Sequence, residues 1–138
     1  MKDHDQAVKE LLNTSHVIAI VGLSGDESKD SNKVGRFLQS KGYRIIPVNP
    51  GTQEILGEKS YRSLSEITEK VDVVDIFMRS EKVVPVVEEA IKLHPKAIWL
   101  QIGIVNHEAK GLVERADIEF FSDICVKREH ERLFPKGD

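Results

Sequence analysis

Hydrophobic residues fall along this chain in short strand-like runs separated by helix-like stripes. The run at 17–21, Val-Ile-Ala-Ile-Val, is apolar at every position, which is typical of a central strand in a parallel sheet. Further strand-like runs lie at 43–48, 71–77, 97–101 and 118–121. Helical spacing is found at 3–13, 33–41, 81–93, 107–115 and 125–134. This alternation predicts right-handed βαβ units: an α/β, three-layer, doubly wound sheet of about five parallel strands with helices on both faces.

Residues that start or stop helices stand at the expected boundaries. Gly42 lies where a left-handed C-cap would end the second helix. Ser80 and Asn106 are predicted N-caps, and the segment 63–66 (Ser-Leu-Ser-Glu) has the spacing of a capping box. Pro47 cannot donate a hydrogen bond, so we expect it at a strand end or at an unpaired position.

Composition narrows the class of protein. The chain has 138 residues, which predicts one domain over 1–138, and 20 basic against 23 acidic side chains give a net charge of −3. This balance gives no reason to expect nucleic acid as a partner. The longest apolar run is too short to span a membrane. With one cysteine, and no apolar run after Met1 that would suggest a signal peptide, we expect a cytoplasmic protein.

The fold predicts where a ligand would bind. In a doubly wound sheet the crevice lies outside the carboxyl ends of the strands, so the candidate loops are 22–33, 49–52, 78–80 and 101–106. The first loop can hold an anion through its glycines, Ser24 and the following helix N-terminus. Lys29, Lys33 and Arg79 could add positive charge. Asp26, Glu27 and Asp30 share the first loop, and we expect them to face water. A plain strand-to-helix turn without a ligand stays open as the alternative.

Several other chemistries lack their motifs. The first loop has no G-x-G-x-x-G, and the second strand ends at Asn49 rather than at an acidic residue, which disfavours ordinary NAD binding. A response regulator would need acidic residues where Gly22 stands. The segment 22–25 is one residue short of G-x-S-x-G, and no histidine is evidently placed to activate Ser24.

The remaining reactive side chains have ordinary interpretations. Cys125 lies near the start of the last helix, where its pKa could be lowered, although a buried inert thiol is the commoner case. The charged segment 127–133 is expected to be a solvated helix face, with Lys127 and Glu131 paired; whether His130 reaches the crevice stays open. No histidine has a partner at metal-ligand spacing, so we predict no metal site.

These loops and strands together resemble a known family. The chain is similar to the CoA-binding domain family, small stand-alone Rossmann-like proteins related to the CoA-binding domain of the succinyl-CoA synthetase alpha subunit. The similarity covers nearly the whole chain, and it is the order and spacing of the matching stretches that makes it specific. These stretches are 17–24, 31–34, 42–50, 55–57, 73–79, 99–106 and 125–130.

The resemblance implies bound coenzyme A and a set of contact residues. By position these are Gly22, Ser24 and Gly25 in the phosphate-facing loop, Asn32, Lys33 and Val34 at the start of the next helix, Asn49 and Pro50 on the adenosine side, Met78 and Arg79 in the third loop, and Gln101 and Gly103 in the fourth. Members often have Tyr and Arg at the places of Asn32 and Lys33, and Arg at the place of Met78. Those differences leave a related ligand or a vestigial site open.

The resemblance therefore predicts a cytosolic protein that binds CoA or acyl-CoA as a small-molecule ligand, without catalytic activity of its own. The synthetase's phosphorylated histidine lies in a second domain that has no counterpart here, so its activity is not carried over. Two alternatives stay open: an enzyme acting on a nucleotide or thioester through Cys125 or His130, and a regulatory or scaffold partner of an acyl-CoA enzyme. A homo-oligomer is compatible with each of these hypotheses.

Overall fold

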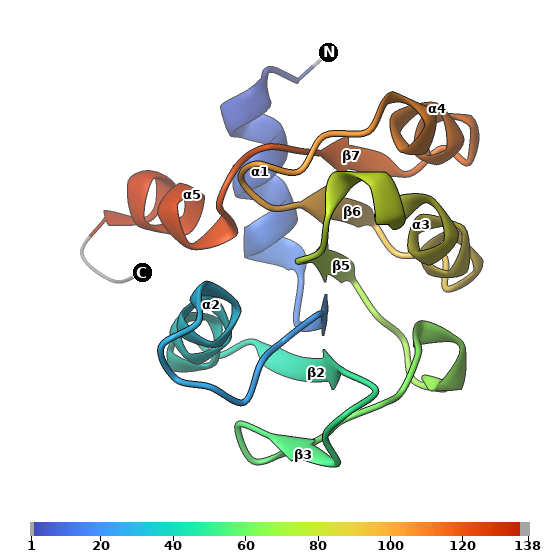
Figure 1. Ribbon diagram of the computed structural model, residues 1–138. Coiled ribbons are helices and arrows are strands. Elements are labelled where there is room, and N and C mark those ends of the chain that lie inside the picture. Colours follow the sequence, from blue (N-terminus) through green and yellow to red (C-terminus); the bar gives the residue numbers. More distant parts are fainter. Residues whose placement is uncertain (1, 136–138) are drawn as a thin grey trace.

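The computed structural model describes residues 2–135 and contains one five-stranded sheet. Its strands run parallel in the order β2-β1-β5-β6-β7 (Figure 1). The strand bounds are Val17–Val21 (β1), Arg44–Val48 (β2), Val73–Ile76 (β5), Ala97–Leu100 (β6) and Glu119–Phe121 (β7). Each predicted strand is confirmed to within a few residues. A small antiparallel hairpin, β3 (Glu54–Ile55) with β4 (Glu58–Lys59), lies in a stretch that the sequence pattern predicts to be irregular.

Helices cover both faces of the sheet, which confirms the predicted three-layer α/β architecture. The α-helices are His4–Thr14 (α1), Asp30–Ser40 (α2), Val83–Lys92 (α3), His107–Arg115 (α4) and Val126–Leu133 (α5). Short 3₁₀ helices span Leu64–Glu66 (η1) and Ser80–Lys82 (η2). Figure 1 shows α1, α2 and α5 on one side of the sheet and α3 and α4 on the other. Among the described residues, no helix is long and apolar enough to cross a membrane.

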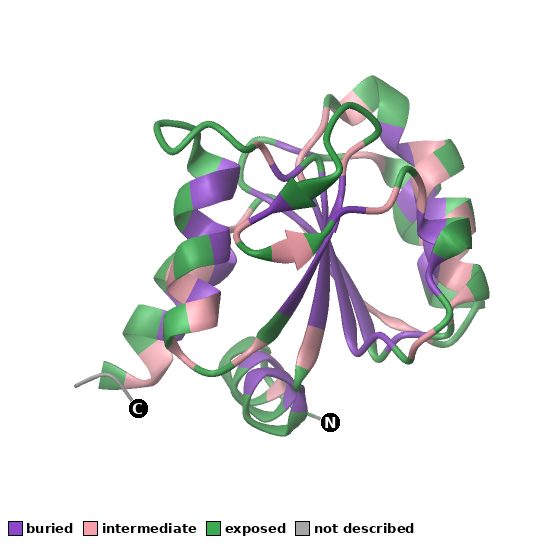
Figure 2. Ribbon diagram, turned by 90° about the horizontal axis from the view of Figure 1, so that it is seen from below, coloured by how far each residue is buried: buried purple, intermediate pink, exposed green. Residues whose placement is uncertain are grey.

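Alternation along β1 divides the core in two. Ile18 and Ile20 pack toward α1, α2 and α5, whereas Ala19 and Val21 pack toward α3 and α4. Trp99, which is fully buried, belongs to the first cluster, and its indole N–H donates to the carbonyl oxygen of Ile124 at 2.8 Å. Figure 2 shows that the strands of the parallel sheet are mostly buried, whereas the hairpin of β3 and β4 and the outer faces of the helices are more exposed.

The helix ends follow the predicted caps in part. Asn106 accepts a hydrogen bond from the backbone N–H of Ala109 at 2.9 Å, as an N-cap should. The Ser80 prediction is wrong: its hydroxyl accepts from the N–H of Val105, and the first turn after it is 3₁₀. Ser63 makes no side-chain cap either, because its hydroxyl is bonded to that of Ser65.

Two residues predicted to have special backbone roles have them. Gly42 adopts a φ of +93° just after α2, which confirms the left-handed end of that helix. Pro47 lies inside β2, the edge strand of the sheet, opposite Ile20 of β1. Because the N–H of Arg44 points at β1, where it donates to His16, the nitrogen of Pro47 three residues later faces the outer side. Its missing donor therefore costs no sheet hydrogen bond.

The strand order fixes the place of the crevice. The chain leaves β1 for α2 and β2 on one side, and later enters β5 on the other side of β1. Strand order therefore reverses between β1 and β5, and ligands of open α/β sheets bind outside the carboxyl ends of the strands at this point.

Candidate functional site

A cavity of about 750 Å³ opens beyond the carboxyl ends of the strands, between α2 and α5. Its volume lies in the range of small-molecule sites, about 300–1,000 Å³. α2 contributes the first wall, the ends of β5 and β6 the floor, and the start of α5 the second wall. The lining residues are Asp30, Lys33, Val34, Arg36 and Phe37 from α2, Phe77 and Met78 after β5, Gln101, Ile102 and Ile104 after β6, and Cys125, Lys127 and Arg128 at α5. We call this cavity the crevice.

The loop before α2 is held by a buried asparagine. Asn32 is 1% exposed; its amide donates to the carbonyl oxygen of Ser24 at 2.8 Å, and its oxygen accepts from Nε of Arg36 at 2.8 Å. Arg36 in turn donates to the carbonyl oxygen of Glu27 at 2.9 Å. The hydroxyl of Ser31 accepts from the N–H of Ser24 at 3.0 Å. These bonds fold the loop back on α2 and leave Lys33 free to face the crevice.

α5 is fixed on the body of the protein by ion pairs with α1. Arg132 lies 2.7 Å from Asp5 of α1, and Glu129 lies 2.9 Å from His4 of α1; within α5, Arg132 also lies 3.0 Å from Glu129. The hydrogen bond from Arg132, together with that from His4, lowers the pKa of Glu129 against the effect of burial. The result is that the first turn of α5, with Lys127 and Arg128, has a defined place beside α2.

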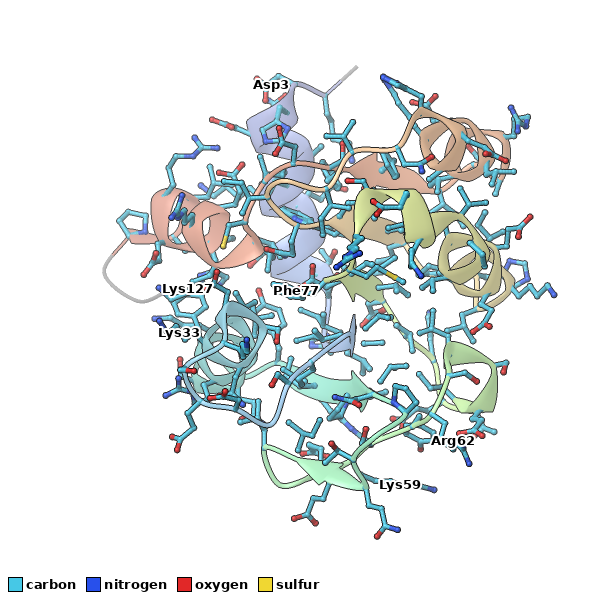
Figure 3. The ribbon with its side chains drawn as sticks, viewed as in Figure 1. Asp3, Lys33, Lys59, Arg62, Phe77 and Lys127 are labelled. Atoms are coloured by element: carbon cyan, nitrogen blue, oxygen red, sulfur yellow. The ribbon has the colours of Figure 1, made fainter. Side chains whose placement is uncertain are left out.

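Both walls of the crevice carry cationic side chains. Lys33, Arg36, Lys127 and Arg128 line it, against the single carboxylate of Asp30. Figure 3 shows Lys33 and Lys127 close together between α2 and α5, with Phe77 deeper toward the sheet. The local charge is therefore positive although the whole chain has a net charge of −3. Such a surface attracts phosphate groups.

The floor of the crevice, with part of the α2 wall, is apolar. Its surface comes from Val34, Phe37, Phe77, Met78, Ile102 and Ile104. Ile102 lines the crevice and is 56% exposed, so part of this apolar surface is open to solvent. The crevice can therefore hold a ligand that has both an anionic part and a long, weakly polar part.

A buried acid supports the floor. Gln101 lines the crevice and is 2% exposed; its side-chain N–H donates to Oδ1 of Asp75, which is fully buried in the middle of β5. Oδ2 of Asp75 has no partner among the described residues. Burial raises the pKa of Asp75 to about 7, although the hydrogen bond from Gln101 lowers it. Because the amide N–H is turned toward Asp75, Gln101 offers its oxygen to the crevice as a hydrogen-bond acceptor.

The structure brings together some of the residues expected at the site and not others. Lys33, Val34, Met78 and Gln101 line the crevice. Asn32 and Ser24 support the loop by the bonds described above. Gly22 lies at the end of β1 against the backbone of Phe77, and Gly25 is exposed with no atom within 4 Å of the place of a Cβ. These four residues shape the rim or the support of the crevice rather than its lining.

The remaining expected residues lie around the crevice. The amide of Asn49 donates to the carbonyl oxygen of Leu23 at 2.9 Å, and Pro50 lines a separate hollow of about 600 Å³ beside the hairpin of β3 and β4. Arg79 is exposed and is not among the lining residues, so the positive charge expected from it comes instead from α5. The N–H of Gly103 donates to Asp123 at 2.7 Å.

Residues of the last helix separate into two environments. Cys125, Lys127 and Arg128 line the crevice. Lys127 and Arg128 were expected on a solvated helix face, so their place in the lining was not predicted. The expected pair of Lys127 with Glu131 is present at 3.4 Å. His130 is 3% exposed and lines a different cavity, so the structure does not bring it into the crevice.

A comparison with protein families identifies the family of this chain. Residues 16–131 match the model of the CoA binding domain. The chain belongs to the CoA-binding domain family. The resemblance recognised in the sequence motifs is thereby confirmed, and the matched region includes every strand of the parallel sheet.

The chain is similar to proteins of two kinds. The uncharacterized protein YneT of Bacillus subtilis is 40% identical over 123 residues, which are 89% of this chain and 91% of that protein. An ADP-forming acetate–CoA ligase of Methanocaldococcus jannaschii is 26% identical over 117 residues, 79% of this chain but only 17% of the ligase. A solved structure from Thermus thermophilus superposes with a TM-score of 0.92 at 35% identity, covering 96% of this chain and all (100%) of that one.

Two features of this CoA-binding domain were not predicted from the sequence motifs. Phe77 and the pair Lys127 and Arg128 line the crevice, although no motif marked them as contacts. A basic pair at the start of a helix is a signal that could have pointed to them, because α5 follows β7 at the same edge of the sheet as the four loops. Asp75, the support of Gln101, stood in the motif 73–79 as an acidic residue inside an apolar strand.

Proposed function

We propose that this protein binds coenzyme A or an acyl-CoA in the crevice and has no catalytic activity of its own. One observation carries the proposal: in a member of the CoA-binding domain family, cationic side chains from α2 and α5 and an apolar floor meet in a single cavity at the switch point of the sheet. The phosphates of CoA would lie against Lys33, Lys127 and Arg128, and its pantetheine arm along Phe77, Met78 and Ile104. A cytoplasmic location, where CoA is available, is part of the proposal.

The acetyl-CoA-forming relatives support the same ligand. This chain spans 17% of the length of the Methanocaldococcus jannaschii ligase, so the ligase holds the matching region as one part of a much larger enzyme. The ligase activity is that of the whole enzyme. Only the binding of CoA is therefore carried to this chain, and an acyl-CoA enzyme is a suitable partner for it.

Titration with CoA tests the proposal. By calorimetry we expect heat of binding, and CoA at 100 times its Kd should stabilise the fold by about 2.7 kcal/mol. Lys33→Ala should weaken CoA about tenfold, because it removes one charge-assisted contact worth about 1.5 kcal/mol or more. Pantetheine, which lacks phosphate, should bind Lys33→Ala and wild type equally.

Lys110→Ala is the matched control. Lys110 is an exposed lysine of α4 on the other side of the sheet, and its removal changes the net charge by the same amount. CoA affinity should be unchanged in this variant. Wild-type protein that shows neither heat nor thermal stabilisation at millimolar CoA would refute the function, and equal losses of CoA and pantetheine would refute the placement of the phosphates.

A second function is favoured by the position of Cys125, whose thiol lines the same crevice. In an enzyme acting on acyl-CoA, the Cys125 sulfur would attack the thioester carbon, the CoA sulfur would leave as the thiol with the proton from Cys125, and water would then release the acid. With Cys125→Ser, acyl-CoA hydrolysis should fall at least a hundredfold under this hypothesis. Under the binding function, both proteins show only the background rate, while CoA affinity stays within about twofold.

A further inference from the structure

A second cavity, of about 280 Å³, lies at the other edge of the sheet, where β1 and β2 begin. Three segments far apart in the sequence meet there: the turn between α1 and β1, the turn between α2 and β2, and α5. The lining residues are Leu12, Asn13, Ser15, His16, Lys41, Gly42, Tyr43, His130 and Phe134. We call it the amino-edge cavity. It shares no lining residue with the crevice.

Two buried polar atoms of this cavity lack hydrogen-bond partners. Ser15 is 4% exposed and His130 is 3% exposed, yet Oγ of Ser15 and Nδ1 of His130 bond to nothing in the described structure. A buried polar group without a partner costs about 1–3 kcal/mol, and native proteins contain few of them. Both residues line the same cavity, and a polar ligand bound there is one way to give these atoms partners.

The aromatic neighbours of His130 do not supply that partner. Its ring is enclosed by Phe37, Tyr43 and Phe134, with ring centroids at 5.4, 5.8 and 4.8 Å. The hydroxyl of Tyr43 is already used, because it donates to the carbonyl oxygen of Leu12 at 2.7 Å. Aromatic and aliphatic groups therefore surround the polar atoms, and this combination suits a ligand with one polar end and one apolar end.

The charge of the cavity selects an anion. Among the described residues, no carboxylate lines it, whereas Lys41 does. Burial lowers the pKa of His130, the charge of Lys41 lowers it further, and Glu131 on the outer side of α5 opposes this in part. His16, at the rim, is exposed. A neutral imidazole beside an ammonium group and a hydroxyl offers donors to an anion without a competing negative charge.

We propose that the amino-edge cavity binds a small monocarboxylate with a compact apolar or aromatic body. The carboxylate oxygens accept hydrogen bonds from Ser15 and His130 and face the ammonium of Lys41. The body of the ligand packs against Leu12 and Phe134. This site is separate from the crevice and does not depend on CoA binding.

Benzoate is the probe, and the full chain is observed by NMR. Benzoate should produce saturable shifts at residues 12–16, 41–43 and 130, with a Kd of about 1–10 mM, as suits a ligand of its size. The bound anion stabilises the imidazolium, so the pKa of His130 should rise on saturation. Benzamide, which has the same shape and no charge, should bind at least tenfold more weakly.

Variants separate the site from general effects on the fold. Ser15→Ala should weaken benzoate at least threefold, and His130→Phe, which keeps an aromatic ring among its aromatic neighbours, should remove measurable binding. Lys33→Ala, in the crevice, is the matched control and should leave benzoate binding unchanged. Ser15→Ala also covers the case in which His130→Phe fails to fold.

Three results would overturn the proposal. Benzoate shifts confined to the residues of the crevice would place the anion elsewhere. Equal affinity for benzamide would refute the selection of an anion. Absence of any shift at about 100 mM benzoate, where even a Kd of tens of millimolar would be seen, would mean that water alone occupies the cavity.

Discussion

Gly22→Ala should destabilise the protein by about 2–6 kcal/mol, the largest effect that we expect from so small a change. Gly22 has a φ of +83°, a conformation that costs a residue with a side chain about 1–3 kcal/mol. A Cβ at this place would collide with the carbonyl oxygen of Phe77, and overpacking typically costs about 1–3 kcal/mol more. Equilibrium unfolding in urea measures the difference.

The collision cannot be relieved by moving either strand alone. The N–H of Gly22 donates to the carbonyl oxygen of Val48 at 2.9 Å, and the N–H of Phe77 donates to that of Val21 at 2.9 Å. β1 is thus held on both sides at the point where it enters the loop of the crevice. Gly22→Ala should therefore also weaken CoA at least tenfold, because the shift moves Phe77, which lines the crevice.

Gly25→Ala is the matched control in the same loop. Gly25 is exposed, and no atom lies within 4 Å of the place that its Cβ would occupy. Its unfolding free energy should stay within about 0.5 kcal/mol of wild type, or rise slightly because alanine restricts the unfolded chain. Similar values for Gly22→Ala and Gly25→Ala would show that the approach of β1 to β5 is not fixed as described.

The parallel sheet was predictable because its strands are buried on both faces. A strand covered by helices on both sides must be apolar throughout, and 17–21 and 97–100 are apolar at every position. The hairpin of β3 and β4 was not predictable, because two-residue strands leave no alternation to detect. The predicted caps at Ser63 and Ser80 were wrong for another reason, because neither hydroxyl bonds to the helix N–H that a cap would bind. The Ser63 hydroxyl bonds to the hydroxyl of Ser65, and the Ser80 hydroxyl accepts from the N–H of Val105.

The crevice was predictable only on the side that the loops provide. Lys33 and Gln101 follow directly from the rule for strand ends. The cations of α5 depend on where that helix packs, and its ion pairs with α1 join residues more than a hundred positions apart in the sequence, such as Asp5 and Arg132. Helical periodicity assigns residues to a face, but it does not show which other element that face will meet. Lys127 and Arg128 therefore look like solvated surface until the fold is known.

Asp75→Asn should make the protein more stable at about pH 8, by about 4 kcal/mol, and change its stability little at about pH 4. In the unfolded chain an aspartate ionises near its usual pKa of 3.8, whereas burial raises the pKa of Asp75 to about 7 in the folded protein. Between these values the folded state keeps a proton that the unfolded state has lost. The free energy of unfolding therefore falls by about 1.4 kcal/mol for each pH unit over this window, and the loss is complete above it.

The asparagine of this variant resembles the protonated acid in shape and has no proton to lose, so the variant's stability should not fall over that window. Asp72, the residue just before the same strand, is the control of opposite sign. Burial raises its pKa, but the backbone N–H groups of His16 and Val17, at 2.8 and 3.0 Å, and the charge of Lys96 outweigh this and lower it. A carboxyl with a lowered pKa stabilises the folded protein at pH values above its usual pKa, and this stabilisation is lost on acidification. Asp72→Asn should therefore be destabilising at neutral pH and nearly neutral in acid.

Urea unfolding of wild type and Asp75→Asn across about pH 4 to 8 measures the first effect, and urea unfolding of wild type and Asp72→Asn from neutral pH to well below pH 3.8 measures the second. A wild-type curve parallel to that of Asp75→Asn would show that the buried carboxyl does not titrate in this window.

The link between Asp75 and the crevice is then tested with CoA. Gln101 offers its side-chain oxygen to the crevice because its side-chain N–H donates to Asp75. An asparagine at position 75 can donate to the Gln101 oxygen instead, which turns the Gln101 amide around. Asp75→Asn should thus gain stability while losing affinity for CoA, and a variant that gains stability with unchanged affinity would show that Gln101 does not depend on Asp75 for its orientation.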